Sequence, residues 1–380
     1  MCPFPSDLIT DILCRLPVKT LLRFKCVSKP WGSLIDDSDF VKIHLHQSLK
    51  TSTNIKLFLD NCVENDNEAY AVDFDSLCNL VQFPRPFTAE ANKYQSRIFG
   101  SCNGLLAVYH RQEGIALWNP STRKYHYLPT LGDDITMDHD ILPGCGYDKN
   151  TILGFGYDVS NSDYKVVKMF RSKTQNCFKV MIYSLKANSW RRIKDCPYDI
   201  FTNYNDGAYV NGSLHWVGDE IDEFFGGKVI FALNLSTEEY FEVPEGDISF
   251  KKNKCGGDCT IFGYMNAGVL GGYLCVSRRY STCSIEEHVN LWVMKEYGVK
   301  ETWTELLHLS RDEWLTNIFH TRAIAYSRSG EKILLDDGGG CQPAWFNLGN
   351  ETGETLCILG VPQCQRFSTI IYVESLVSVY

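Results

Sequence analysis

The most informative absence in this sequence is that of any long apolar run. No stretch of its 380 residues approaches the roughly 18 apolar, uncharged residues that a membrane-spanning helix needs, so we expect no membrane span. The first residues, MCPFPSDL, contain neither the basic stretch nor the apolar core of a secretory signal, and we expect no such signal. These absences predict a protein of the cytoplasm, the nucleus or both.

Patterns that carry catalysis or hold a cofactor are also missing. Gly144-Cys145-Gly146 lacks the rest of the G-x-S-x-G pattern of a nucleophile elbow. Gly154-Phe155-Gly156 begins a strand without the helix that dinucleotide binding requires. Cys255 and Cys259 lack a second thiol pair at the spacing of a structural zinc site, because Cys275 and Cys283 do not provide it. We expect no catalytic residue, no cofactor and no bound metal.

Charge and cysteine content narrow the classes further. The net charge is -9, and residues 1–50 hold seven basic and five acidic side chains, so the negative excess lies in the remainder of the chain. A chain this acidic fits poorly with a nucleic-acid partner, and we expect none. The 16 cysteines occur in a chain long enough to build a core, which favours reduced and mostly buried thiols. His44 and His46 could face solvent together, as an incomplete metal site.

The first feature that is present is a dense helical segment, residues 5–45. Pro5-Ser6-Asp7 is typical of a helix start, with Ser6 or Asp7 as the capping residue. Apolar residues then recur at three- and four-residue spacing until Pro17, and Ser38 or Asp39 could cap a later helix. About 40 residues cannot usually bury so many large apolar side chains by themselves. Either the rest of the chain or a second protein must cover them.

The order of these residues closely resembles the F-box of plant F-box proteins. The resemblance rests on FPSDLITDILCRLPVKTLLRFKCVSKPWGSLI (residues 4–35), with Phe4 where the family most often has leucine. F-box helices bind the Skp-type adaptor of a cullin-based (SCF) ubiquitin ligase. The five basic side chains between Arg15 and Lys29 suit the acidic adaptor of that family. Carried over by position, the resemblance implies adaptor contacts from Pro5, Leu8, Ile12, Leu16, Pro17, Leu21, Leu22, Val27 and Trp31, of which we expect about half to be core.

From residue 55 onward the sequence changes to short strand-like runs separated by turn residues. Two units recur along it. One is a turn followed by an apolar strand, at 102–106, 210–216 and 270–275. The other is a hairpin of two strands, at 117–129, 182–193, 231–244, 291–306 and, more degraded, 345–360. The hairpins follow one another at a spacing of about 50–65 residues, which indicates a repeat architecture.

Repeated four-strand units of this kind are typical of a β-propeller. At about 45 residues per blade the region gives about seven blades, and we predict six to eight. A pair of β-sandwiches is the alternative fold. A kelch label would be weak, because only Gly271-Gly272 and Gly226-Gly227 provide the expected glycine pair. We predict an α + β multidomain chain, with an all-α F-box domain at 1–46, a short linker at 47–54 and a large all-β, propeller-like domain at 55–380.

Aromatic residues follow the same repeat. Tryptophans at 118, 190, 216, 292, 303 and 345 recur within strand units, so we expect them in the core between blades. Trp314, in the polar stretch Glu313-Trp314-Leu315, is the best candidate for an exposed recognition residue.

The strand region also resembles the F-box-associated domain that follows the F-box in a large plant family. The matching segments include LWNPSTRKYHYLP and FGYDVSNSDYKVVKMF, and residues 371–377 are similar to the S-locus branch as well. In that family the second domain binds the protein to be ubiquitinated. The resemblance therefore implies a non-catalytic substrate receptor that binds a Skp-type adaptor and, through it, cullin. Its target stays open between immune receptors, pistil ribonucleases and other proteins. A propeller enzyme and a non-degradative interaction scaffold are the alternatives.

Overall fold

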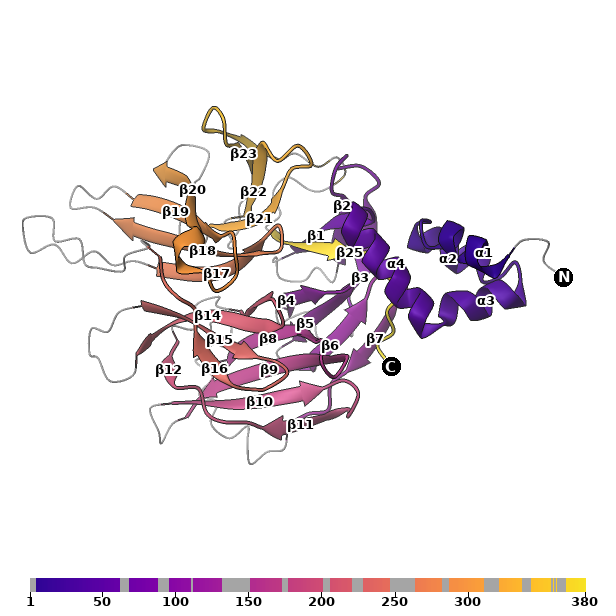
Figure 1. The fold of residues 1–380 in the computed structure, drawn as a ribbon, viewed down its shortest axis with the longest axis horizontal. Helices are drawn as coiled ribbons and strands as arrows, with labels where there is room; N and C mark the ends of the chain where they lie inside the picture. Colours follow the sequence, from indigo (N-terminus) through magenta and orange to yellow (C-terminus); the bar gives the residue numbers. More distant parts are fainter. Residues whose placement is uncertain are drawn as a thin grey trace, which may run out of the picture.

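The protein is described here from a computed structural model, in which helices occupy the N-terminal part and strands the rest (Figure 1). The structure describes residues 5–61, 68–87, 96–110, 112–131, 151–172, 177–200, 206–220, 228–246, 264–281, 287–310, 321–336, 343–356, 358, 360 and 367–380.

The N-terminal domain consists of four helices within these described residues: α1 (Ser6–Leu13), α2 (Val18–Phe24), α3 (Lys29–Asp36) and α4 (Ser38–Thr51). Pro5 and Pro17 directly precede α1 and α2 in an extended conformation, which suits a residue that fixes φ and lacks an N–H. Leu13, Leu21 and Ile35 form the centre of the domain and are almost completely buried.

Two details of the helix boundaries differ from the sequence prediction. Ser6 lies inside α1, which has no side-chain cap, and Asp37 rather than Ser38 or Asp39 caps α4 by accepting hydrogen bonds from two backbone N–H groups. The expected linker at 47–54 is mostly helical, because α4 continues to Thr51. The extra turn places Ser48 in a buried position, where its hydroxyl accepts a hydrogen bond from Asn54 at 2.9 Å.

The strands form six antiparallel sheets in the described part of the chain, which are the blades of a β-propeller. Blade 1 contains β25 (Phe367–Val373), β1 (Ile55–Asn61), β2 (Glu68–Asp73) and β3 (Val81–Pro84), in order from the innermost strand outward. Blade 2 contains β4 (Ser96–Cys102), β5 (Leu105–His110), β6 (Gly114–Asn119) and β7 (Lys124–Tyr127). Blade 3 contains β8 (Thr151–Asp158), β9 (Asp163–Arg171), β10 (Phe178–Ser184) and β11 (Ser189–Arg192).

The remaining blades follow the same plan. Blade 4 contains β12 (Tyr198–Asp199) and β13 (Ala208–Val210), both paired with β14 (Ser213–Glu220), and then β15 (Lys228–Asn234) and β16 (Tyr240–Glu242). Blade 5 contains β17 (Tyr264–Leu270), β18 (Tyr273–Ser281), β19 (Glu287–Met294) and β20 (Trp303–Ser310), with the 3₁₀ turn η2 (Lys300–Thr302) before β20. Blade 6 contains β21 (Arg322–Tyr326), β22 (Lys332–Asp336), β23 (Ala344–Asn347) and β24 (Thr352–Thr355).

The inner strands close a ring, because β25, β4, β8, β13, β17 and β21 are neighbours in that order and β21 returns to β25. The last strand of the chain, β25, pairs with β1 from Ile55↔Val373 to Asn61↔Phe367 and so completes blade 1. Six blades confirm the predicted range of six to eight. The estimate of seven was too high because it assumed about 45 residues per blade, whereas the hairpin spacing in this chain is longer.

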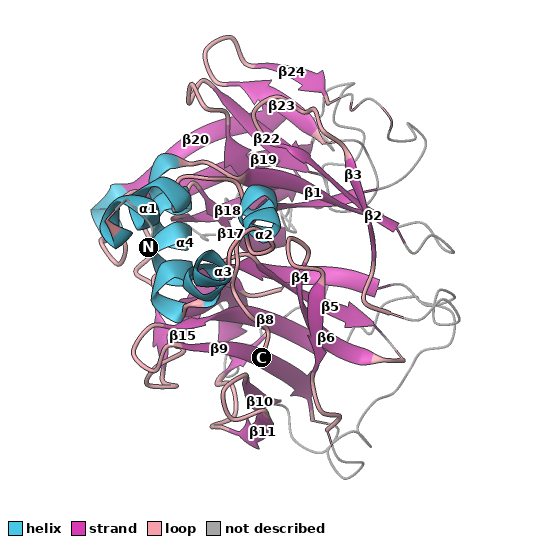
Figure 2. Ribbon diagram, turned by 90° about the vertical axis from the view of Figure 1, so that its right-hand side faces the viewer, coloured by secondary structure: helices cyan, strands magenta, loops and turns pink. Residues whose placement is uncertain are grey.

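Both predicted repeat units are confirmed. The turns at 103–104, 211–212 and 271–272 join the first and second strands of blades 2, 4 and 5. The five hairpins join the third and fourth strands of blades 2 to 6. In antiparallel sheets these two connections leave the same face of the ring, and β1 begins at that face beside the end of β25. The helices lie against this face (Figures 1 and 2).

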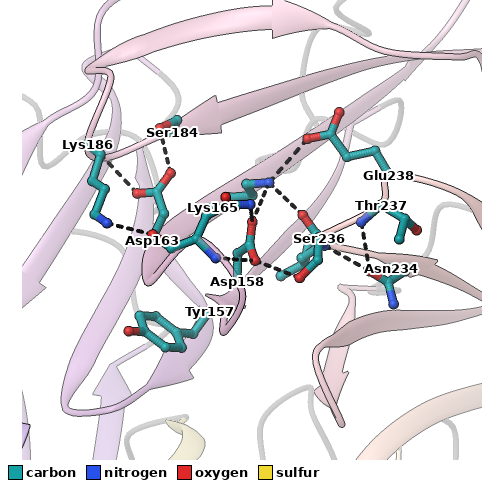
Figure 3. Close-up of polar contacts among 12 residues, drawn as sticks. Tyr157, Asp158, Asp163, Lys165, Ser184, Lys186, Asn234, Ser236, Thr237 and Glu238 are labelled. Carbon is teal, nitrogen blue, oxygen red and sulfur yellow. Dashed lines mark hydrogen bonds and ion pairs between the residues drawn. The ribbon is translucent and has the colours of Figure 1, made fainter.

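A buried polar cluster fastens blade 3 to blade 4 (Figure 3). The ammonium group of Lys165 on β9 lies 2.8 Å from Asp158 at the end of β8 and 3.2 Å from Glu238 in the turn of blade 4. Ser236 donates a hydrogen bond to Asp158 at 2.6 Å across the same boundary. Asp158 is completely buried and Lys165 almost so. Blades 3 and 4 are thus held together by polar contacts as well as by apolar packing.

Candidate functional site

Five of the nine residues predicted to contact an adaptor are exposed on the helical domain. They are Pro5, Leu8, Ile12, Pro17 and Val27. The large apolar side chains among them are far more exposed than core residues, with Leu8 at 53%, Ile12 at 60% and Val27 at 68%. Leu8 and Ile12 are four residues apart and therefore lie on one face of α1. The chain's own propeller leaves these side chains uncovered.

The other four predicted residues are partly or fully buried. Leu16, Leu22 and Trp31 are half-buried, and the ring of Trp31 packs against Phe24 with centroids 5.4 Å apart. Leu21 was also among the predicted contact residues, but it is fully buried in the helical core. It faces inward because the helical period that exposes its neighbours turns it toward the centre of the domain.

Basic side chains are exposed on the same helical domain. Arg15, Lys19, Arg23 and Lys29 are exposed, and Arg15 is paired with Asp11 at 2.9 Å. Lys25 is half-buried and paired with Asp36. Lys19 and Arg23 lie on α2, which follows α1 in the sequence and precedes Val27. This combination of exposed apolar groups with positive charge fits an acidic protein surface.

The structure corrects the prediction that His44 and His46 face solvent together. His46 is exposed, but His44 is completely buried and its Nε2 lies 2.9 Å from the carbonyl oxygen of Leu16. Burial lowers the pKa of His44, so the neutral ring donates a hydrogen bond to this carbonyl. The interaction holds the turn between α1 and α2 against α4, and single-sequence patterns gave no sign of it.

The helical domain is seated on the propeller through α4 and the C-terminal residues. Val41 and Leu45 of α4 pack against the apolar core of blades 2 and 3, and Leu376 packs within the helical core. Figure 1 shows α4 beside the propeller and α1, α2 and α3 projecting beyond it. The candidate contact face therefore lies on the part of the helical domain that extends away from the propeller.

The six tryptophans predicted to pack in the core are not exposed. Trp118, Trp216 and Trp303 are buried, and those at 190, 292 and 345 are half-buried. Gly154-Phe155-Gly156 lies within strand β8, as predicted. The predictions for Gly144–Gly146, Gly226-Gly227, Cys255–Cys259 and Glu313–Leu315 fall outside the described residues.

Ion pairs occur on the propeller face opposite the helices, where the inner strands begin. Arg97 at the start of β4 is paired with Asp206 before β13, and Arg322 at the start of β21 lies 3.1 Å from Asp336. Burial raises the pKa of Asp206, while the positive charges of Arg97 and Arg322 lower it. The Arg97–Asp206 pair joins blade 2 to blade 4, whereas Arg322 and Asp336 lie on adjacent strands of blade 6. No group of three or more metal-ligating side chains occurs among the described residues.

No helix in the described part of the chain is long and apolar enough to cross a membrane.

Comparisons with known proteins cover nearly the whole chain. Residues 2–43 match the family model described as the F-box domain, and residues 61–379 match the one described as the F-box associated beta propeller domain. F-box protein CPR1 of Arabidopsis thaliana is 31% identical over 395 residues, which cover 99% of this chain and 89% of that protein. A second F-box protein of that plant is 29% identical, covering 99% of this chain and 90% of its own length. An F-box/kelch-repeat protein of the same plant is 28% identical over 80% of this chain and 79% of its own length.

Proposed function

This chain belongs to the family of F-box proteins with an F-box-associated β-propeller domain, and from that premise we propose that it is the substrate-recognition subunit of an SCF ubiquitin ligase. Its helices bind a Skp-type adaptor and, through it, cullin. Its propeller binds a target protein, which is ubiquitinated and then degraded. The chain itself performs no catalysis in this role, and it acts in the cytoplasm, the nucleus or both.

The exposed apolar face of the helical domain is the observation that carries this proposal. Leu8 and Ile12 on one face of α1 expose more than half of their surfaces, as does Val27 after α2, and adjacent exposed apolar side chains are typical of binding surfaces. The exposed basic side chains of the same domain favour an acidic partner. The predicted contact residues Pro5 and Pro17 are also exposed, and Leu16, Leu22 and Trp31 are half-buried.

We assign target binding to the propeller face opposite the helices. The helical domain and the C-terminal residues already occupy the other face, where the short turns between strands lie. A target held on the opposite face remains accessible to the ubiquitin-loaded enzyme while the helices hold the adaptor. Binding to the ligase then raises the effective concentration of the target's lysines at that enzyme.

The adaptor contact can be tested with Ile12→Ala combined with Val27→Ala in the full-length chain. Both side chains are exposed, so the variant should fold as the unmodified protein does. If binding buries both, the lost apolar contact is worth about 1–2 kcal/mol per residue and weakens adaptor binding roughly 30- to 1,000-fold. The measurement is a titration with purified Skp-type adaptor. Leu16 and Trp31 suit this test less well, because they are half-buried and their truncation would also loosen the helical core.

Val159→Ala is the matched control, because Val159 is 66% exposed but lies on the propeller. It should bind the adaptor as tightly as the unmodified protein. Undiminished adaptor binding by the double variant would contradict the proposal. A second experiment distinguishes a substrate receptor from a non-degradative scaffold. The ligase is reconstituted together with a protein that the propeller captures, and ubiquitin transfer to that protein is measured. Ubiquitin transfer to that protein supports a substrate receptor, whereas adaptor binding without transfer to any captured protein supports a non-degradative scaffold.

A further inference from the structure

The residues after β25 belong to two apolar cores at once. Leu376 is 8% exposed and packs in the helical core with residues such as Leu13 and Phe40. Val377 and Val379 are equally or more deeply buried, but they pack in the core of blades 2 and 3. Consecutive residues of one short segment thus pack in different domains. We call residues 374–380 the tail segment.

Polar contacts fix the tail segment to blade 2. Asn119, the last residue of β6, is completely buried, and its amide group donates hydrogen bonds to the carbonyl oxygens of Ser375 at 3.1 Å and Val377 at 2.8 Å. Its side-chain oxygen accepts from the backbone N–H of Ser121 at 3.0 Å and from the hydroxyl of Tyr372 at 3.2 Å. One side chain therefore uses both of its polar atoms to join the turn of blade 2 to the end of the chain.

The space around the tail segment is closely filled. Gly104 in the turn between β4 and β5 has φ of +82°, and a Cβ atom there would lie 2.1 Å from the hydroxyl oxygen of Ser375. On the other side, the backbone N–H of Glu374 donates to the carbonyl oxygen of Asn54 at 2.9 Å, directly before β1. The two chain segments that connect the domains, before β1 and after β25, are therefore hydrogen-bonded to each other. A freely hinged linker would lack such contacts.

We propose that the tail segment is a positioning element of the ligase, which holds the F-box helices in one orientation relative to the propeller. Asn119 and Leu376 are the positioning residues. This inference rests on the proposed function, because a fixed orientation matters only if the helices and the propeller hold different proteins. A rigid connection concentrates ubiquitin transfer on those lysines that lie within reach of the loaded enzyme, whereas a loose one spreads it over many.

The key variant is Asn119→Asp, which keeps the accepting oxygen but replaces the donating amide with a second oxygen facing two carbonyl groups. Asn347→Asp is the matched control. Asn347 also ends the third strand of its blade, and its oxygen caps the following turn by accepting from Gly349 at 2.8 Å. Leu376→Ala tests the apolar side of the clamp, and Leu376→Met should restore most of the packing.

The first measurement is the distribution of distances between fluorophores at residues 39 and 329 in the full-length chain bound to adaptor. Asp39 lies in α4 and Ser329 in a turn of blade 6, and both are exposed. We expect a narrow distribution for the unmodified protein, Asn347→Asp and Leu376→Met, and a broad one for Asn119→Asp and Leu376→Ala. Amide exchange at residues 375–379 should also become at least about tenfold faster in the latter two.

The second measurement is the set of the chain's own lysines that become ubiquitinated in the reconstituted ligase. This set should widen in Asn119→Asp and Leu376→Ala. Asn119→Asp should keep an adaptor affinity close to that of Asn347→Asp, because the hydrogen bonds of Asn119 go to blade 2 and the tail segment and not to the helices. Equal distance distributions and equal lysine sets in Asn119→Asp and Asn347→Asp would overturn the inference. Failure of the unmodified protein to bind adaptor would instead overturn the proposed function, so the two failures are distinct.

Discussion

Lys165 provides the sharpest test of how the propeller is held together. Its ammonium group lies between two carboxylates from different blades, Asp158 in blade 3 and Glu238 in blade 4, with side chains that are 8%, 0% and 15% exposed, respectively. It also donates to the carbonyl oxygen of Leu235 at 2.5 Å. Lys165→Met keeps an unbranched apolar side chain of similar length but removes all of these hydrogen bonds and the charge.

The expected cost follows from the burial of the pair. Removal of one partner from a buried ion pair typically costs about 3–5 kcal/mol, because the remaining charge stays buried without its counter-charge. Asp158 would keep hydrogen bonds from Ser236 at 2.6 Å and Asn161 at 2.7 Å, and Glu238 would keep its ion pair with Arg191. We therefore expect a loss near the lower limit, about 3 kcal/mol in the free energy of unfolding.

The pH dependence of stability gives an independent test of whether the Lys165–Asp158 pair stabilises the folded protein. Burial alone would raise the pKa of Asp158, but hydrogen bonds from Lys165, Ser236 and Asn161 outweigh it and hold that pKa well below its usual value. A carboxyl group with a depressed pKa in the folded state stabilises the protein above its unfolded pKa of about 3.9, and this stabilisation is lost as the pH falls through the folded value. The difference between Lys165→Met and the unmodified protein should therefore be full at pH 7 and shrink below about pH 4.

Denaturant unfolding of the full-length chain, followed by tryptophan fluorescence, measures this difference. Asp158→Asn combined with Lys165→Met is the control, because it removes the buried carboxylate together with its partner. The double variant should recover part of the stability that Lys165→Met loses. A loss below about 1 kcal/mol for Lys165→Met, or a loss that stays the same at pH 3, would refute the reasoning.

Two further predictions concern the ring and its closure. Gly104→Ala should destabilise the protein by about 1–3 kcal/mol more than Gly212→Ala. Both glycines have positive φ, but only at Gly104 would the new methyl group meet the tail segment, at Ser375. Denaturation midpoints measure the stability of both variants, and equal losses would contradict the predicted clash. Burial lowers the pKa of His215 from 6.5 to about 4, and its Nε2 accepts from the hydroxyl of Tyr297 in the next blade at 2.6 Å. Because the unfolded chain binds this proton first, the unmodified protein should lose about 1.6 kcal/mol of its free energy of unfolding between pH 6.5 and pH 5. Unfolding at each pH measures this loss, and His215→Gln should not show that part of it.

Local patterns were sufficient to predict the building blocks of the propeller. The polar turns between apolar strands mark hairpins whose signals lie within a few residues of one another. An example is Asn103-Gly104, where positive φ at both residues suits the tight turn between β4 and β5. The tryptophans of the return strands indicated the packing between blades for the same reason. Signals of this kind depend only on neighbours in the sequence, so a single sequence is enough to find them.

Contacts between distant parts of the chain could not be predicted in this way. The pairing of β25 with β1 joins residues more than 300 positions apart, and nothing in residues 367–373 alone identifies their partner. For the same reason, the sequence could not tell which apolar F-box residues are exposed and which are buried. Leu8 and Leu21 both belong to apolar helical patterns, and only the packing of all four helices determines that Leu8 is exposed and Leu21 buried. His44 escaped prediction because its partner is the carbonyl oxygen of Leu16, 28 residues earlier.

The position of Leu376 links the beginning of the chain to its end. The helical core around Leu13 and Leu21 lies within the first 40 residues, yet Leu376, which packs against it, follows the strand that closes the ring. Contacts between such distant segments form late, because the entropy of closing the intervening loop must be offset first. The helical core is therefore completed only when β25 has paired with β1 and closed the propeller. In a chain that lacks its last strand, the F-box helices would lose Leu376 as well as their seat on blades 2 and 3. Under the proposed function, adaptor binding would then depend on the integrity of the domain that binds the target, and the ligase would assemble from complete receptors.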